Sequence, residues 1–217
     1  MVLGDLGFFD KQEAINTFSA YGSRYIGHPN TEVPGIEINS GSLGHGLALG
    51  QGQGGEGLLL EHRVAGEAAR PCLTVERPAL RVPDAVGDGE MAEGSNYEAM
   101  MAASQYGLDN LCATVDVNRL QISGFTREVM SSDDLCEKFR SFGWHVIEVQ
   151  DGNSCAQLLT AYEEAGYVKD KPVAVIAYTV KGKGVSFMED NKSWHHGVMT
   201  QEQYEQAVRE LEEALHE

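Results

Sequence analysis

Short, almost wholly apolar runs alternate with stretches of helical periodicity over the second half of the chain. Three such runs, residues Leu111–Val117, Trp144–Val149 and Val173–Tyr178, predict buried strands, because the strands of a parallel sheet are covered on both faces. The order strand–helix–strand repeats from residue 111 onward, which favours a mainly parallel sheet with right-handed connections. The pattern therefore predicts a doubly wound α/β fold with helices on both faces of the sheet.

Each helix expected around these strands begins after a polar residue that can cap its first turn. The predicted caps are Asp10, Ser131 or Ser132, Asn153 and Thr200, with Glu13 and Gln203 completing capping boxes in the first and last helix. Apolar residues then recur at helical spacing and predict the inward faces. These residues are Ala14, Ile15, Phe18 and Tyr21 before Gly22, then Leu158, Leu159 and Tyr162, and finally Tyr204, Ala207, Val208, Leu211 and Leu215.

A glycine turn with a carboxylate at its centre precedes the first of the three strands. The turn Gly87-Asp88-Gly89 is followed by a helical stretch from about Glu90 to Tyr106, and the strand after it ends at Asn118. Consecutive strand, helix and strand place Asp88 and Asn118 at neighbouring strand ends, where open α/β sheets bind ligands.

The chemistry of this turn indicates a metal ion and a phosphorylated ligand. Carboxylate and amide oxygens suit Mg²⁺ or Ca²⁺ better than zinc. Gly87 and Gly89 allow the backbone to approach a bulky anion closely, and the N-terminus of the following helix favours phosphate. The alternative is an ordinary strand–turn–helix connection that binds nothing.

Composition restricts the class of protein and of partner. The chain has 217 residues, 42% of them hydrophobic, so we expect residues 1–217 to form a single globular domain. A net charge of −17 argues against nucleic acid or an anionic membrane as a partner, and neither a signal peptide nor a membrane span is recognisable. The cysteines show neither close pairing nor zinc spacing, which is typical of a reducing cytoplasm; they are Cys72, Cys112, Cys136 and Cys155.

The fuller text around the turn resembles a known family. The strings GDGEMAEGSNYEA and LDNLCATVDVNRLQISG, at this spacing, resemble the N-terminal, thiamine diphosphate-binding half of transketolase. The resemblance covers residues 1–50 and 87 to about 210, and it implies thiamine diphosphate and Mg²⁺, with Ca²⁺ as an alternative metal. Deoxyxylulose-phosphate synthase and dehydrogenase E1 subunits share the turn and the asparagine, whereas the strings LQISG and SWHHG favour transketolase.

The resemblance also implies which residues bind the cofactor. The metal ligands would be the side chains of Asp88 and Asn118 and the backbone carbonyl of Leu120. Further cofactor contacts would come from Gly41, Leu43, Gly87, Gly89 and Ile122.

Catalytic roles follow from the same resemblance. His28, in the string GHP, and His196 would contact the sugar and assist proton transfer, with His195 as the alternative to its neighbour. Glu93, together with Glu98, matches acids that lie near the subunit interface and link two active sites. The alternative for both glutamates is an exposed helix charge.

Residues 51–86 depart from the family pattern. Four glycines within residues 51–57 oppose a helix, and Pro83 and Asp84 stand where a central strand needs Val or Ile. A reading-frame change, a sequence error and a genuine insertion all explain the departure. We therefore expect an irregular or inserted segment here, which disturbs the strand that should position Gly87 and Asp88.

Two functions follow as expectations. The first is the N-terminal subunit of a transketolase, which transfers two-carbon ketol units between sugar phosphates in the pentose phosphate pathway. It would need a separate C-terminal subunit, because the resemblance does not cover the pyrimidine-binding half, so the active form would be a hetero-oligomer or dimer. The family's first histidine motifs are also not covered, and a C-terminal subunit would not explain their absence. The second is a non-catalytic, truncated remnant of that subunit.

Overall fold

The computed structural model describes residues 2–28, 30–36, 46–48 and 82–215. Its contacts divide the chain into two compact units, Met1–Leu43 and Gly44–Glu217. The single domain over residues 1–217 stays a prediction. Within the described ranges, no helix is both long and apolar enough to cross a membrane.

The first unit contains two short helices and the loop that follows them. Helix α1 (Val2–Asp5) precedes α2 (Lys11–Thr17), and the Asp10 carboxylate accepts a hydrogen bond from the Glu13 backbone N–H at 2.9 Å. The predicted cap is therefore confirmed.

The inward face predicted for α2 is wrong at most of its positions. Ala14 is buried against Tyr25 and Val33, whereas Ile15 and Phe18 are 53% and 60% exposed and Tyr21 is fully exposed. The helix has only 7 residues and ends well before Gly22, so little of its surface can face this small core.

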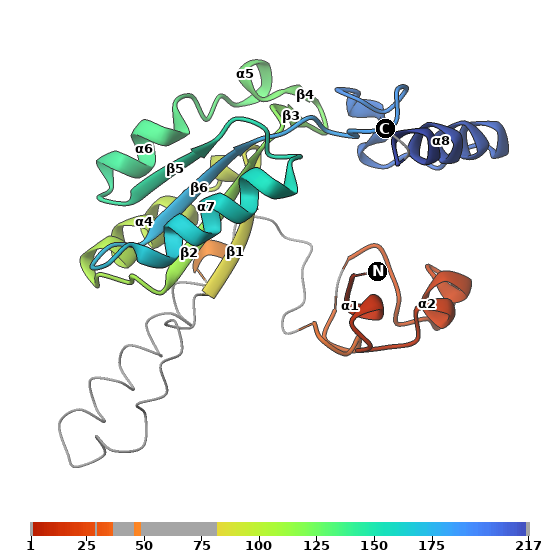
Figure 1. Ribbon diagram of the computed structural model, residues 1–217, viewed down its shortest axis with the longest axis horizontal. Coiled ribbons are helices and arrows are strands. Elements are labelled where there is room, and N and C mark those ends of the chain that lie inside the picture. Colours follow the sequence, from red (N-terminus) through yellow and green to blue (C-terminus); the bar gives the residue numbers. More distant parts are fainter. Residues whose placement is uncertain (1, 29, 37–45, 49–81, 216–217) are drawn as a thin grey trace, which may run out of the picture. The chain divides into compact units, whose positions relative to one another are not determined.

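Four parallel strands form the main sheet of the second unit (Figure 1). Their order in the sheet is β1 (Val82–Gly87), β2 (Leu111–Val117), β6 (Val173–Tyr178) and β5 (His145–Val149). Each strand pairs in parallel with its neighbour. The parallel sheet is confirmed, and β2 and β6 have the predicted bounds.

Helices cover both faces of this sheet, as a doubly wound fold requires. Helices α4 (Gly94–Gln105) and α6 (Leu135–Ser141) pack on one face, and α7 (Cys155–Tyr167) packs on the other. Successive side chains of a strand point to opposite faces. Accordingly, Ile176 belongs to the core under α4 and α6, and its neighbour Val175 belongs to the core under α7.

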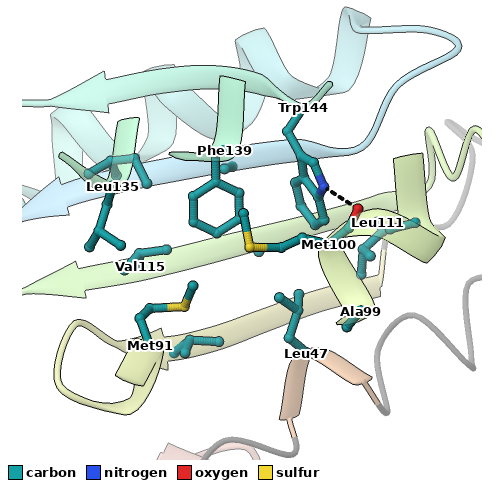
Figure 2. Packing of buried hydrophobic residues seen from close by; sticks show 14 of the residues in the cluster. Leu47, Met91, Ala99, Met100, Leu111, Val115, Leu135, Phe139 and Trp144 are labelled. Carbon is teal, nitrogen blue, oxygen red and sulfur yellow. Dashed lines mark hydrogen bonds between the residues drawn. The ribbon is translucent and has the colours of Figure 1, made fainter. Parts of the chain in front are cut away.

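The larger core joins α4, α6 and the sheet through aromatic and sulfur-containing side chains (Figure 2). The rings of Phe139 and Trp144 meet edge-on, with their centroids 5.2 Å apart. The indole Nε1 of Trp144 donates a hydrogen bond to the Met100 carbonyl at 3.0 Å, and both residues are buried. This bond ties the start of β5 to the middle of α4.

The strand before the glycine turn is formed, so the expectation of irregular structure is wrong for residues 82–86. Strand β1 pairs with β2 along its whole length, from Val82 opposite Leu111 to Gly87 opposite Asp116. Among the described strands β1 lies at the end of the sheet order, and an edge strand tolerates a proline such as Pro83. The remainder of the anomalous segment, residues 51–81, lies outside the described residues.

Two of the predicted caps are wrong, one by two or three residues and the other by a single residue. Helix α6 is capped by Asp134 and α7 by Ser154, the residues directly before each helix. The predicted caps have other partners: Ser131 bonds Asp133, and the Asn153 amide oxygen accepts from the Val180 N–H at 2.8 Å.

The helical faces predicted near the C-terminal end are only partly buried. Leu158 of α7 packs against the core, whereas Leu159 and Tyr162 are 63% and 41% exposed. Helix α8 (Gln201–Ala214) has the predicted capping box between Thr200 and Gln203. Of the residues predicted to form its inward face, Ala207 is buried, whereas three are exposed: Tyr204, Leu211 and Leu215.

Candidate functional site

The ends of β1 and β2 bring the glycine turn and Asn118 together. The strands are parallel neighbours, with Gly87 opposite Asp116. One residue beyond β1, the Asp88 N–H donates to the Asp116 carbonyl at 2.9 Å. Asp88 and Asn118 therefore follow adjacent strand ends, as the sequence predicted.

The carboxylate of Asp88 is buried and held by backbone donors. Its Oδ1 accepts from the Gly89 N–H and its Oδ2 from the Arg119 N–H, both at 2.9 Å. The side chain is 2% exposed. Burial raises the pKa of Asp88 above its usual value, the nearby Asp116 charge adds to the rise, and the two backbone hydrogen bonds oppose it. A cation at this carboxylate would relieve the cost of burying its charge.

The loop after β2 wraps around this carboxylate. Arg119 has a left-handed backbone, with φ of 62°, and its N–H is the one that donates to Asp88. The amide of Asn118 is held at both ends: its Oδ1 accepts from the Leu120 N–H at 3.0 Å, and its Nδ2 donates to Asp116 at 3.1 Å. The three predicted metal ligands thus belong to two turns, after β1 and after β2, that hydrogen bonds join.

The glycine turn leads into a 3-10 turn, η1 (Glu90–Ala92), before α4 begins at Gly94. The predicted helix from Glu90 is thus divided into two parts. The Glu90 carboxylate accepts from the Gly87 N–H at 3.2 Å and closes the turn on itself. Glu93 caps α4 through the Ser95 N–H, and Glu93 and Glu98 are both exposed.

A two-stranded hairpin of β3 (Leu120–Gln121) and β4 (Gly124–Phe125) borders the turn. Ile122, at its tip, is 61% exposed, so the apolar surface that the resemblance assigns to the cofactor is open. Helix α5 (Thr126–Val129) follows the hairpin. Sequence reasoning assigned no role to Gln121, whose side chain packs against Gly89.

The neighbouring histidines lie in a loop tied to that hairpin. Helix η2 (Lys192–His195) is joined to it by a hydrogen bond of 3.1 Å from Lys192 Nζ to the Ser123 carbonyl. The two imidazole rings of His195 and His196 are 4.7 Å apart and nearly perpendicular. His195 is half-buried and His196 is exposed. Burial lowers the pKa of His195, and the nearby charges of Lys181 and His196 lower it further.

The remaining predicted residues fall in or near the first unit. His28 is exposed there and borders an apolar pocket of about 420 Å³. Gly41 and Leu43 lie outside the described residues.

A polar cavity of about 440 Å³ adjoins Asp88 in the second unit. Arg119, Thr126 and Tyr178 also line it. The site therefore combines a buried carboxylate, a fixed amide, a glycine turn and an open polar cavity, an arrangement that can hold a hydrated metal ion and an anion.

Residues 2–214 match the family described as transketolase, thiamine diphosphate binding domain. The chain belongs to this family. It is 44% identical over 207 residues to an apulose-4-phosphate transketolase subunit of Phocaeicola vulgatus, covering 95% of this chain and 68% of that protein. The corresponding protein of Actinobacillus succinogenes is 35% identical over 212 residues, covering 97% of this chain and 70% of that protein.

Complete transketolases are similar over a smaller share of their length. The human enzyme is 34% identical over 210 residues, which cover 97% of this chain and 30% of that protein. The solved structure of Pichia stipitis transketolase with sedoheptulose 7-phosphate aligns with a TM-score of 0.76 and 29% identity, over 92% of this chain and 29% of that one. The predicted family and fold are confirmed, and the synthase and dehydrogenase alternatives are not favoured.

Proposed function

We propose that this chain is the thiamine diphosphate-binding subunit of a two-part transketolase, which transfers two-carbon ketol units between sugar phosphates. The chain spans about two thirds of the apulose-4-phosphate transketolase subunits that it resembles and under a third of the human enzyme. A separate C-terminal subunit would supply the other half of such an enzyme, so we expect a hetero-oligomer. The observation that carries the proposal is the buried Asp88 carboxylate beside Asn118 at two adjacent parallel strand ends.

These residues fit the cofactor and its metal. The Asp88 carboxylate, the Asn118 amide oxygen and the Leu120 carbonyl would hold Mg²⁺, or Ca²⁺ in its place, and each is a hard oxygen donor. The Gly87-Asp88-Gly89 turn would receive the diphosphate. Bound thiamine diphosphate would supply the carbon nucleophile that cleaves a carbon–carbon bond of the ketose. The protein would position the cofactor, the metal and the sugar.

We assign the sugar-facing work to histidines. His28 and His196, or His195 in place of the latter, would donate hydrogen bonds to sugar hydroxyls and move protons near neutral pH. Glu93 and Glu98 would act at the interface between subunits, and their exposure in the isolated chain supports that role. Gly41, Leu43 and Ile122 would complete the cofactor contacts.

The proposal extends to the class of substrate and to the cellular location. The similar proteins are named for apulose 4-phosphate and for 6-deoxy-6-sulfo-D-fructose, so we expect a sugar-phosphate or related substrate and test several. Cys136 and Cys155 form no disulfide within the described part of the chain, which supports a cytoplasmic location.

The remnant hypothesis is disfavoured by one structural finding. It rested partly on disruption of the strand that positions Asp88, and β1 is formed up to Gly87 and fully paired with β2. The formed strand ends support the proposal that this chain binds the cofactor.

The test combines binding and turnover. The chain is co-purified with a transketolase C-terminal subunit, and calorimetry measures binding of thiamine diphosphate with Mg²⁺. A coupled assay then measures ketol transfer with several ketose–aldose phosphate pairs. We expect binding and transfer by the complex, and loss of both in Asp88→Ala with retention in the exposed control Glu213→Gln. A folded complex that binds no cofactor would support the remnant hypothesis and overturn the proposal.

A further inference from the structure

The side chain of Gln121 lies across the glycine turn. A Cβ atom built on Gly89 would stand 2.7 Å from Gln121 Cγ and 3.3 Å from both its Cδ and its Nε2. These distances mean that the whole glutamine side chain, including its amide, runs in contact with the Gly89 backbone. The absence of a side chain at Gly89 is what makes room for it.

The amide nitrogen of Gln121 is buried without a hydrogen-bond partner among the described residues. Buried donors in folded proteins are almost always paired, so an unpaired one marks a strained group or a site for a missing partner. The residue as a whole is half-buried, so part of it is exposed although the amide nitrogen is not. What it lacks is an acceptor.

The acceptors and donors nearest in the turn already have partners. The Gly89 N–H donates to Asp88 Oδ1, and the Gly89 carbonyl accepts from the Ala92 N–H at 3.3 Å. Asp88 Oδ2 accepts from the Arg119 N–H. None of these bonds involves the Gln121 amide, so an external acceptor can serve as its partner.

The hairpin fixes Gln121 in this position. The residue pairs with Gly124 across the hairpin, and the preceding turn is anchored by the bond between Arg119 and Asp88. The hairpin tip is held in addition by Lys192. A preorganised donor of this kind loses little freedom when a ligand accepts from it.

We propose that Gln121 is a diphosphate-binding residue, whose Nε2 donates a hydrogen bond to an oxygen of the cofactor's diphosphate. The inference rests on the proposed function, because it takes the ligand of the glycine turn to be thiamine diphosphate. A diphosphate offers only acceptor oxygens here, which match the missing acceptor. A neutral amide also suits the position because its N–H can donate to the anion while the group adds no negative charge beside Asp88.

One competing role is structural. Asn96, which is fully buried, has a side-chain Oδ1 without a partner in the described part of the chain, although its Nδ2 donates to the Glu90 carbonyl at 2.8 Å. If a water molecule joined this oxygen to the Gln121 amide, the glutamine would serve the fold and not the cofactor. The two roles predict different responses of the cofactor-free protein.

The experiment uses the complex with the C-terminal subunit and two variants. Gln121→Met keeps the length of the side chain and removes the donor, and Gln121→Glu keeps its shape and adds a negative charge. The matched control is Gln105→Met, at an exposed glutamine of α4. Calorimetry measures the Kd of thiamine diphosphate and of thiamine monophosphate, each with Mg²⁺, and thermal unfolding without cofactor measures the Tm.

The expected result is a Kd for thiamine diphosphate about 10-fold higher in Gln121→Met, the lower end for a hydrogen bond to a charged group, and a larger rise in Gln121→Glu. The preference for diphosphate over monophosphate should fall, and the cofactor-free Tm should be unchanged. A lowered Tm with wild-type Kd would overturn the inference in favour of the structural role, and wild-type values for both would overturn it outright. A wild-type complex that binds neither compound would instead overturn the proposed function.

Discussion

The buried carboxylate of Asp88 accepts a hydrogen bond of 2.9 Å from the backbone N–H of Arg119, which joins the turn after β1 to the turn after β2. Arg119 donates this bond from a left-handed backbone with φ of 62°, and a second backbone donor, the Gly89 N–H, holds the other carboxylate oxygen. Two strand ends are thereby locked together around a charge that is costly to bury.

The first prediction concerns the pH dependence of stability without cofactor. The pKa of Asp88 is raised in the folded state, so the folded chain binds its proton more tightly than the unfolded chain, where the value is about 3.9. The stabilisation from this group is complete below the unfolded pKa and is lost as pH rises through the folded pKa. Urea unfolding of wild type and Asp88→Asn across pH should show their free-energy difference falling over that window, then levelling.

When Mg²⁺ and thiamine diphosphate are present, the pH dependence of this difference in the free energy of unfolding between wild type and Asp88→Asn should reverse. The reason is that a bound cation favours the charged carboxylate. The exposed variant Glu213→Gln is the control and should follow wild type throughout. A wild-type curve parallel to that of Asp88→Asn at every pH would show that Asp88 titrates normally.

The second prediction concerns the contact between Gly89 and Gln121. Gly89→Ala places a methyl group 2.7 Å from Gln121 Cγ, so the side chain must move, at a cost of about 1–3 kcal/mol in the free energy of unfolding. Its backbone φ of −67° suits alanine, so the cost is steric. Gly94→Ala is the matched control, because nothing lies within 4 Å of the added atom and alanine favours helix.

A double variant separates this contact from other effects. Gln121→Ala removes the Cγ atom, so Gly89→Ala should cost much less in that background than in wild type. Additive free energies of unfolding in the cycle would contradict the contact.

The third prediction concerns the core under α4 and α6. Trp144→Phe removes the hydrogen bond to the Met100 carbonyl and part of the buried ring, so it should lower the free energy of unfolding by about 1–3 kcal/mol through the lost bond and the lost packing. Urea denaturation measures this loss. Tyr167→Phe, at a tyrosine that is 85% exposed, should change little. Equal stability of the two variants would mean that the indole hydrogen bond and the lost ring atoms contribute little to stability.

Much of the fold was predictable because its strands are buried on both faces. Continuous apolar runs predicted β2 and β6 with their observed bounds, and the strand–helix–strand order alone placed Asp88 and Asn118 at adjacent strand ends. The strand β1 was missed because Pro83 is acceptable only at a sheet edge, and edge position is a property of the assembled sheet.

The parts of the site that escaped prediction depend on tertiary contacts. Gln121 has an ordinary place in the sequence, and only the closing of the β3–β4 hairpin sets its amide against Gly89. The observed helix caps likewise differ from the predicted ones. Ser131 and Asn153 form hydrogen bonds with other residues, and the residue directly before each helix caps it instead. Because several neighbouring residues are of types that can cap a helix, the sequence alone could not decide which of them does so.

The last prediction distinguishes the two neighbouring histidines. His195 is half-buried, and its Nδ1 is buried without a partner in the described part of the chain, whereas His196 is exposed. Burial and the neighbouring charges lower the pKa of His195, so its imidazole is neutral at pH 7 and able to accept a proton. We therefore expect His195→Gln to reduce kcat/KM of the two-subunit complex by about 100-fold and His196→Gln to have a much smaller effect.

The pH profile of the wild-type complex gives a second readout for His195. In wild type, kcat/KM should decrease as the pH is lowered below about pH 6.5, the ordinary pKa of histidine. This decrease should be absent in His195→Gln. The cofactor Kd, measured on the same preparations, should be unchanged in both variants, which separates a role toward the sugar from one toward thiamine diphosphate. The opposite ranking, with the large loss in His196→Gln, would assign the substrate-facing position to His196.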